Sequence, residues 1–462
     1  MFGKLAAVIE IPELRRRLFV TLALLAIYRI GVFVTVPGVN RNAMTKIVAG
    51  SGGGLLGLLD LFTGGALQLM SIFALGIMPY ISASIIMQMM AVVVPAVERM
   101  KKEGQTGQRK ITQYTRYGTV GLSLVQGFLI SSYLINLNEG TPGLLVDTGI
   151  GFRIMTIVTL TTGAVFMMWL GEKITDHGLG NGISLLITAG IIAQFPQAVY
   201  STYTQFDSGQ LSPIQVLLLL GICLVITGAI VFVESAQRRI RLQYAKRMVG
   251  RKIYGGQQHH LPLKLNMAGV MPPIFASSFL VFPTTIASYF QDHPLGVMVQ
   301  TVLRPGDWRY TIIYVILNVF FCFFWVSTQY NVVDIADNLK RSGAFIPGIR
   351  PGKRTAEYLD EVMTRLTVAA SAYISLVCIL PFLMQDSLKI SFYFGGTSLL
   401  IVVSVGLDTV SQIENHLLTR HYNDFGKAAA GAASAGGIKG RDRDQEDMEY
   451  AEFTEAPEDD KT

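Results

Sequence analysis

Residues 213–233 read PIQVLLLLGICLVITGAIVFV, a stretch without a single charged side chain. A helix needs about 20 mostly apolar residues to cross the roughly 30 Å hydrocarbon core of a bilayer. This stretch is long enough and apolar enough to do so. Three arginines, Arg238, Arg239 and Arg241, follow shortly after it, as expected where a span ends on the cytoplasmic side. We therefore predict a transmembrane helix here.

The rest of the chain repeats this pattern. Of its 462 residues, 51% are hydrophobic and only 15% are charged, whereas soluble domains carry about a quarter charged residues. The apolar residues are gathered into long runs, which predict the spans 18–36, 71–95, 114–137, 154–171, 182–202, 213–233, 268–290, 309–330, 366–385 and 391–412. The sequence therefore predicts an all-α integral membrane protein of ten transmembrane helices.

The basic residues predict the orientation of these spans. Lys and Arg are concentrated in 1–17, after the second span, and in the long loops 234–266 and 331–365, whereas the alternate connections hold few. Because cytoplasmic loops are enriched in Lys and Arg, we expect both termini in the cytoplasm, with 1–17 as a cytoplasmic segment. Ten spans form two halves of five, 18–202 and 213–412, which enter the membrane in opposite senses. This arrangement predicts an inverted-topology repeat.

Three segments outside the spans have an unusual composition. Residues 38–70 are Gly-rich and too broken for a full crossing, so they predict a re-entrant or interfacial helix that is buried in protein or lines a cavity. Residues 178–182, GLGNG, resemble a glycine-rich nucleotide fingerprint, but no strand precedes them, and we predict a tight turn that caps the fifth span. Residues 427–462 pass from a small-residue linker to an acidic stretch and predict a disordered tail.

The chemistry that the sequence lacks narrows the function. It contains no phosphate-binding loop and no H-E-x-x-H or G-x-S-x-G motif, and its six histidines show no ligand spacing. Cys223, Cys322 and Cys378 stand alone within spans and are interpreted as small buried hydrophobic residues. We therefore predict no enzymatic activity, no cofactor and no metal site.

The spans hold few ionisable groups, chiefly Arg29 in the first span and Asp408 near the cytoplasmic end of the last. Ion-coupled transporters normally place carboxylates or histidines at mid-membrane, so their scarcity argues against one. We interpret Arg29 as a buried side chain that satisfies helix-end carbonyls. An ion-coupled secondary transporter of a small solute is still the alternative function, because inverted repeats and broken helices suit it too.

Several segments resemble signatures of the SecY/Sec61 alpha family. Residues 71–90, SIFALGIMPYISASIIMQMM, are similar to its second-helix signature, and 168–187, MWLGEKITDHGLGNGISLLI, to the signature that joins helices four and five. Residues 266–272 (NMAGVMP), 340–352 (KRSGAFIPGIRPG) and 392–401 (FYFGGTSLLI) also look like bacterial members. The resemblance covers nearly the whole chain, through about His421.

The resemblance implies a channel between the two halves, closed by a ring of six apolar side chains. The ring maps onto Ile77, Ile81, Ile183, Ile187, Ile274 and Ile401. A narrow apolar constriction dewets, and moving a bare ion into a low-dielectric medium costs on the order of tens of kcal/mol, so such a ring blocks ions. Aliphatic side chains also let any unfolded sequence pass without binding it. The alternative is that these isoleucines face lipid or a neighbouring helix, as isoleucine in a span does by default.

The resemblance also implies two movable parts. A short plug helix at about 55–70 would fill the outer funnel, and its residues are Leu55, Leu58, Leu59, Asp60, Leu61 and Phe62. An ordinary interfacial loop is the alternative for this segment. A lateral gate, through which apolar segments partition into lipid, would include Pro79, Ser82 and Gln88 of helix two and Pro272 and Pro273 of helix seven.

The loops 234–266 and 331–365 are implied as the partner surface. Their basic residues are Arg238, Arg239, Arg247, Arg251, Lys252, Arg350, Lys353 and Arg354. The positive-inside rule alone accounts for such charges, but the loops are longer than topology requires. In the family they dock the ribosome, whose RNA is a phosphate surface, or the SecA ATPase.

The function that the resemblance implies is that of a protein-conducting channel subunit in the bacterial inner membrane. It would pass secretory polypeptides across the membrane and release transmembrane segments laterally into it. The resemblance implies SecE and SecG as the other channel subunits. It also implies nascent secretory and membrane polypeptides as substrates, and anionic lipids as membrane partners.

Overall fold

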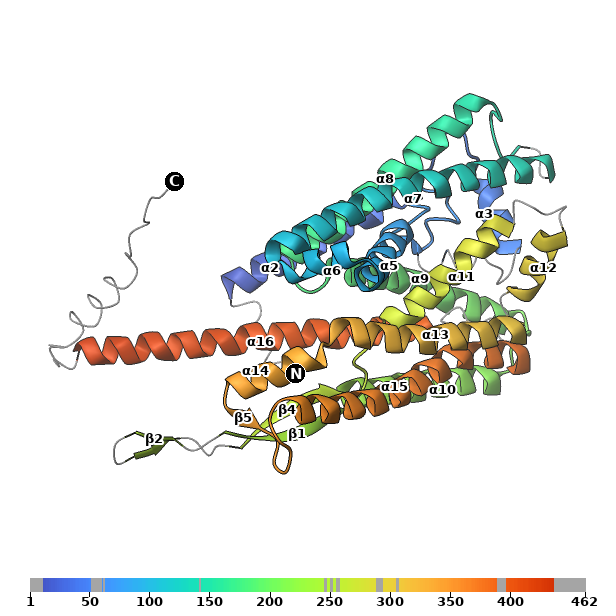
Figure 1. The fold of residues 1–462 in the computed structure, drawn as a ribbon. Coiled ribbons are helices and arrows are strands. Elements are labelled where there is room, and N and C mark those ends of the chain that lie inside the picture. The colour runs from blue at the N-terminus through green and yellow to red at the C-terminus, as the bar shows by residue number, and fades with distance from the viewer. Residues whose placement is uncertain are drawn as a thin grey trace, which may run out of the picture. The chain divides into compact units, whose positions relative to one another are not determined.

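The computed structural model describes residues 11–50, 60, 63–140, 143–244, 247–249, 252–254, 258–287, 294–304, 307–388 and 396–435. The chain divides into two units, Met1–Thr409 and Val410–Thr462. Figure 1 shows the long helices and the few short strands.

The described chain is mostly helical, which confirms the predicted fold class. The helices are α2 (Pro12–Gly31), α3 (Arg41–Gly50), α5 (Met78–Val93), α6 (Pro95–Lys102), α7 (Gln105–Gly140), α8 (Ile150–His177), α9 (Gly182–Asp207), α10 (Pro213–Ser235), α11 (Met271–Ala287), α12 (Pro294–Val302), α13 (Trp308–Gln329), α14 (Val332–Arg341), α15 (Lys353–Leu388) and α16 (Gly396–Ala435). The strands are β1 (Gln237–Tyr244), β2 (Arg247–Val249), β3 (Lys252–Tyr254), β4 (Gln258–Lys264) and β5 (Ala344–Phe345).

Seven helices in the described ranges are long and apolar enough to cross a membrane: α7, α8, α9, α10, α13, α15 and α16. The bent pair α5–α6 makes an eighth candidate. The two other predicted spans correspond to α2, which carries four arginines, and to α11, which is described only as far as Ala287. On α10, Leu217, Leu224 and Phe232 are each more than 70% exposed. Large apolar side chains in such a row suit lipid rather than water.

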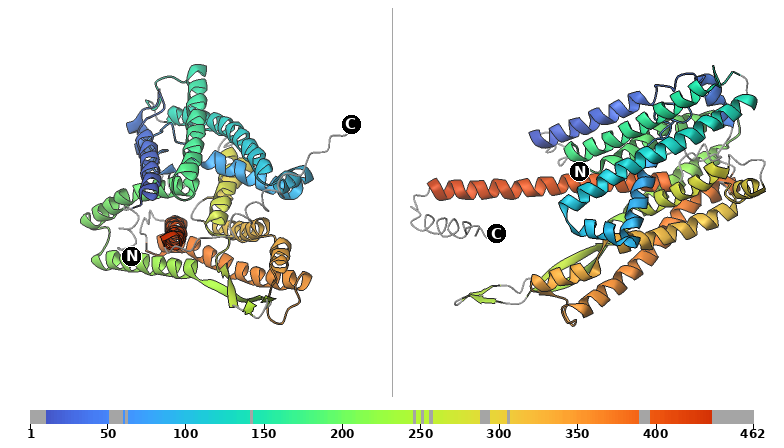
Figure 2. Two further views of the ribbon diagram at one scale, coloured as in Figure 1. Left: turned by 90° about the vertical axis from the view of Figure 1, so that its left-hand side faces the viewer. Right: turned by 45° about the horizontal axis from the view of Figure 1, so that its top comes forward.

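The helices of each half pack on one another. In the first half, α7 lies along α8, α8 contacts α2 and α9, and α5 contacts α7. In the second half, α13 packs between α11 and α15. The two sets meet where α5 contacts α11. The end-on view in Figure 2 shows α7 and α8 on one side and α13 and α15 on the other.

The predicted span 71–95 differs from a continuous helix. Residues 64–70 and 72–77 form turns on either side of an isolated bridge from Ser71 to Thr35, and α5 begins only at Met78. Gly76 has φ +56° and Pro79 lies in the first helical turn, so the chain changes direction before the helix starts. Pro95 then opens α6, which is bent by 99° from α5. The helical part is therefore shorter than the apolar run.

The turn at 178–182 caps the fifth span, as predicted. The side-chain oxygen of Asn181 accepts hydrogen bonds from the backbone N–H groups of Ile183 (3.1 Å) and Ser184 (3.4 Å). These are donors in the first turn of α9 that have no partner within the helix. The cap therefore starts α9 at Gly182.

The loop 234–266 contains strands that the sequence analysis does not predict. β1 pairs with β4 in antiparallel register from Gln237↔Lys264 to Gln243↔Gln258, and β5 pairs with the other edge of β1. β2 and β3 form a separate antiparallel pair. In β1, Ile240 and Leu242 are buried whereas the arginines beside them are exposed. This alternation is the period of a half-buried strand.

The second long loop and the last helix also differ from expectation. The loop 331–365 contains α14, β5 and the first turns of α15, which starts at Lys353 rather than near 366. α16 continues to Ala435, so residues 427–435 of the predicted disordered tail are helical. They are rich in alanine, the strongest helix former. Residues 436–462 lie outside the described residues.

Candidate functional site

Five of the six predicted ring isoleucines are buried in one apolar cluster. Their exposed fractions are 5% for Ile77, 6% for Ile81, 4% for Ile187, 3% for Ile274 and 1% for Ile401. Ile183 is partly buried and packs against the same cluster. We call these six side chains the isoleucine cluster.

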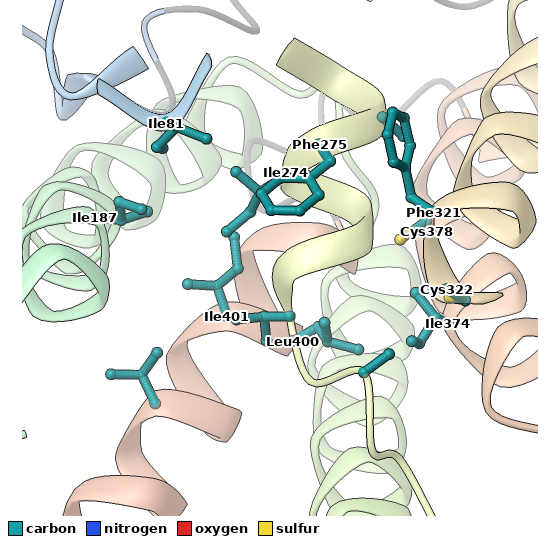
Figure 3. Packing of buried hydrophobic residues seen from close by; sticks show 14 of the residues in the cluster. Ile81, Ile187, Ile274, Phe275, Phe321, Cys322, Ile374, Cys378, Leu400 and Ile401 are labelled. Carbon is teal, nitrogen blue, oxygen red and sulfur yellow. The ribbon is translucent and has the colours of Figure 1, made fainter. Parts of the chain in front are cut away.

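The isoleucine cluster is assembled from four different helices. Ile81 comes from α5, Ile187 from α9, Ile274 from α11 and Ile401 from α16. Figure 3 shows these four side chains directed from separate ribbons toward a shared region. Helices of the first half and of the second half therefore meet at aliphatic side chains, which can neither bind an ion nor donate a hydrogen bond.

The ends of two helices position the first-half members of the cluster. Ile77 is the N-cap residue of α5 and not a residue within it, which differs from the predicted pair on one helix face. Its carbonyl still accepts the Ile81 N–H at 3.1 Å, so the two residues are one turn apart. Ile183 and Ile187 lie in the first two turns of α9, directly after the Asn181 cap.

Of the predicted plug residues, only Asp60 lies in a described range; Leu55, Leu58, Leu59, Leu61 and Phe62 lie outside it. Asp60 is 3% exposed. Its Oδ1 accepts hydrogen bonds from the backbone N–H groups of Leu67 (3.1 Å) and Gln68 (3.0 Å). The Gln194 Nε2 of α9 donates to the Asp60 carbonyl at 2.7 Å. Asp60 therefore closes a turn and is joined to α9.

Two side chains of α2 bind the same turn. The Tyr28 hydroxyl donates to the Thr63 carbonyl at 3.1 Å, and Arg29 Nη1 donates to the Gly64 carbonyl at 2.8 Å. Arg29 thus binds a backbone carbonyl, as predicted, but that carbonyl belongs to this turn and not to a helix end. Gly64 has φ +68° and lies so close to Gly190 that an added Cβ would be 2.6 Å from the Gly190 Cα. We call residues 60 and 63–70 the tethered turn.

The carboxyl group of Asp60 has a perturbed affinity for protons. Burial raises its pKa to about 6, although the N–H groups of Gln68 and Leu67 and the Thr63 hydroxyl act in the opposite direction. The folded chain therefore binds the proton more tightly than the unfolded chain does. Between pH 4 and 6, roughly, the stability of the tethered turn falls as the pH rises.

We expect the tethered turn to be more stable at pH 5 than at pH 7.5. The measurement is the hydrogen-exchange protection of the Leu67 and Gln68 amides, each divided by its intrinsic rate at the same pH. Asp60→Asn keeps the oxygen acceptor without the charge, so its protection should be independent of pH in this range. Equal pH dependence in the wild type and in Asp60→Asn would contradict the assignment to Asp60.

The predicted gate residues lie on both sides of the contact between α5 and α11. Pro79 is buried at the start of α5, and Pro272 and Pro273 are buried in the first turn of α11. Ser82 and Gln88 are partly buried, and the Gln88 amide donates to Ser84 at 3.2 Å. Sequence analysis missed the direct contact, in which the Ser278 hydroxyl of α11 lies 3.7 Å from the Met78 sulfur of α5.

The predicted basic residues in the described ranges lie on strands, turns and a helix start of the two long loops. Those described with exposed side chains are Arg238, Arg239, Arg350, Lys353 and Arg354. Arg247 lies in β2 and Lys252 in β3, whereas Arg251 lies outside the described residues. Arg354 is 3.9 Å from Glu357, a long ion pair between exposed groups that contributes little.

The cysteines are free thiols. Cys322 and Cys378 are buried, as predicted, whereas Cys223 is half-exposed on α10. In the described ranges no group of three or more His, Cys, Asp or Glu side chains has a metal-binding arrangement.

The fold and the cluster together define a class: a multispanning helical membrane protein whose two halves meet at an aliphatic cluster, with a tethered turn beside it. Comparison with known proteins agrees. A family model described as SecY matches residues 71–410. The protein translocase subunits SecY of Haemophilus influenzae and Escherichia coli K12 are each 47% identical over 420 residues, covering 90% of this chain and 95% of those proteins.

Solved structures extend the likeness to the fold. "The structure of a protein conducting channel" matches with TM-score 0.60 at 18% identity, over 87% of this chain and 92% of that one. A structure of an idle yeast Ssh1 complex bound to the yeast 80S ribosome matches with TM-score 0.55 at 13% identity, over 88% and 90%. The chain belongs to the SecY family.

Proposed function

We propose that this chain is the protein-conducting channel subunit of a translocase, in which unfolded polypeptides pass through the isoleucine cluster. The relatives named protein translocase subunit SecY and the protein-conducting channel of similar fold support this function over the small-solute transporter. The observation that carries the proposal is the cluster itself, buried aliphatic side chains contributed by α5, α9, α11 and α16. In this role the chain is not an enzyme, and the energy for transport comes from its partners.

In this proposal the isoleucine cluster is the seal of the empty channel. Water held between aliphatic walls has no hydrogen-bonding partner there, so a narrow constriction empties and excludes hydrated ions. An arriving polypeptide displaces no specific contact, because dispersion forces between apolar side chains are individually weak and non-directional. The seal therefore yields to any sequence.

The predicted plug, residues 55–70, is proposed to cover the outer side of this seal. The support comes from its described end, the tethered turn, whose hydrogen bonds reach α2 through Tyr28 and Arg29 and α9 through Gln194. A solved SecY structure of similar fold concerns a plug domain that stabilises the closed state of that channel. Here the same role falls to a segment tied to two first-half helices.

The contact between α5 and α11 is proposed as the lateral gate, with Pro79, Ser82, Gln88, Pro272 and Pro273 near it. Separating these helices would expose a passing segment to lipid. A stretch of about 20 apolar residues then partitions into the bilayer, while one mid-helix charge costs about 2.5–3.5 kcal/mol. In the described part of the two helices, the hydrogen bond that joins them runs from the Ser278 hydroxyl to the Met78 thioether sulfur, a weak acceptor, so little polar energy opposes their separation.

The proposed environment is a bacterial inner membrane, with both termini and both long loops in the cytoplasm. The proposed partners are SecE and SecG as channel subunits, and the ribosome or the SecA ATPase on the loops 234–266 and 331–365, with anionic lipids around the spans. The exposed arginines of β1 and of the turn at Arg350 support a polyanionic partner such as ribosomal RNA.

Charge reversal at Arg350 or Arg354 is expected to lower export about tenfold while leaving membrane insertion of the channel unchanged, because a carboxylate there repels an anionic partner. The measurement is export into proteoliposomes that contain equal amounts of channel. Arg41→Glu is the matched control, an exposed arginine at the start of α3 on the opposite predicted side. Normal export by both loop variants would remove these residues from the partner surface.

The function is tested by photocrosslinking to a stalled secretory polypeptide. A photoreactive residue at Ile81 or Ile187 is expected to crosslink to the polypeptide in transit. The same residue at Leu224, 74% exposed on α10, is expected to crosslink to lipid only. Absence of crosslinks from both cluster positions during active export would overturn the proposed path.

A further inference from the structure

The two ends of the first long loop are hydrogen-bonded to each other. Asn266 Nδ2 donates to Glu234 Oε1 at 2.7 Å. Glu234 is the residue before Ser235, the end of α10, and Asn266 follows β4, so this bond closes the base of the hairpin formed by β1 and β4. The backbone N–H of Leu265 donates to the Ala236 carbonyl at 2.9 Å directly beside it.

Asn266 is also bonded to Gly269, two residues before the start of α11. Its Nδ2 donates to the Gly269 carbonyl at 3.2 Å, and its Oδ1 accepts the Gly269 N–H at 3.0 Å. Asn266 is only 2% exposed, so each lost bond would leave a buried polar group without a partner, which is energetically unfavourable. One side chain therefore holds α10, the hairpin base and the segment that leads into α11.

A second connection joins the hairpin base to α16. Lys264 Nζ, at the end of β4, lies 3.0 Å from Asp408 Oδ1. The Ser404 hydroxyl hydrogen-bonds to the Glu234 carboxylate. The base thus contacts the helix that carries Ile401, while Asn266 contacts the segment that leads into the helix that carries Ile274. The apolar side chains of Ile240, Leu263 and Met267 belong to the same buried cluster as these isoleucines.

We propose that Asn266 is a positioning residue that transmits the docking of a polyanionic partner on the β1–β4 hairpin to α11. This inference rests on the proposed function of the loop 234–266 as the partner surface. The hairpin is paired over seven residues of each strand, so a force on its exposed arginines reaches the base without bending a loop. At the base, Asn266 passes the displacement to Gly269 and thus to the helix that bears Ile274 and Ser278.

The test measures the gate separately from binding. Met78→Cys and Ser278→Cys replace the side chains in contact across α5 and α11, and a short bis-maleimide links them; mass spectrometry of the linked peptide distinguishes this pair from the native cysteines. The full channel complex is used in proteoliposomes, with and without a ribosome that carries a stalled nascent chain. Ribosome binding is measured in parallel by co-flotation.

We call the channel that carries Met78→Cys and Ser278→Cys, with Asn266 intact, the parent pair. In the parent pair the ribosome is expected to lower the crosslinking yield by about fivefold or more, which is the lower end of ordinary coupling between sites. In Asn266→Ala the ribosome should bind with unchanged affinity, the yield without ribosome should be unchanged, and the fall should be lost. Glu234→Gln keeps an acceptor and should respond like the parent pair. Glu234→Leu should lose the response, and combining it with Asn266→Ala should add nothing.

Asn318→Ala is the matched control. Asn318 is also fully buried and hydrogen-bonded, at 3.0 Å to Ser375 between α13 and α15, but it does not contact the hairpin in the described structure. It should respond like the parent pair. A normal fall in Asn266→Ala, or a yield already low before ribosome is added, would overturn the transmission role. Absence of ribosome binding to the parent pair would instead overturn the proposed docking surface, and this inference with it.

Discussion

Asparagine at both Ile81 and Ile187 is expected to make the empty channel leak small ions about ten- to a hundredfold faster. The two residues face a shared apolar region from α5 and α9 (Figure 3). A side-chain amide in that region can hydrogen-bond to water. Such a hydrogen bond lowers the free-energy cost of placing a polar species among apolar side chains by roughly 1–3 kcal/mol. Lowering the barrier to ion passage by roughly 1.4 kcal/mol raises the ion flux tenfold.

The measurement is ion flux from proteoliposomes without substrate. Valine at both positions keeps the wall aliphatic and should leave the flux unchanged. Ile192→Asn, on the same helix but 53% exposed, should also leave it unchanged. If the double asparagine variant stays as tight as the parent, the isoleucine cluster is not the seal.

Alanine at Gly64 is expected to release the tethered turn. Its Cβ would lie 2.6 Å from the Gly190 Cα and 2.9 Å from the Tyr28 hydroxyl, and the position has φ +68°. Overpacking costs about 1–3 kcal/mol, and the left-handed conformation adds about 1–2 kcal/mol for a residue with a Cβ. The turn should therefore lose about 2–5 kcal/mol of stability.

Gly65→Ala separates these two causes. Gly65 has φ +88°, but nothing lies within 4 Å of its added Cβ, so this variant carries the backbone strain alone. We expect weaker protection of the Leu67 and Gln68 amides in both variants, and a clearly larger loss in Gly64→Ala. Ion leak from the empty channel should follow the same order. Equal effects of the two substitutions would mean that contact with α9 does not hold the turn.

Much of the fold could be predicted from the sequence because membrane insertion depends on local hydropathy. A run such as 213–233 crosses the bilayer for the same reason wherever it stands in a chain, and α10 covers it entirely. The GLGNG turn was also predictable, because an asparagine before an apolar helical run is a local cap signal. The isoleucine cluster depended on a resemblance, since isoleucine in a span is by default an ordinary lipid-facing or packing residue.

Local hydropathy is sufficient to predict the membrane class, most of the spans and the apolar character of the site. The path of residues 60 and 63–77, the strands of the long loop and the contacts of Asn266 depend on tertiary contacts. Hydropathy is a property of residues that are neighbours in the chain. Buried backbone N–H and C=O groups outside helices, in contrast, hydrogen-bond to residues that only folding brings near them. For Asp60 that partner is Gln194, and for Gly64 it is Arg29, both far away in sequence.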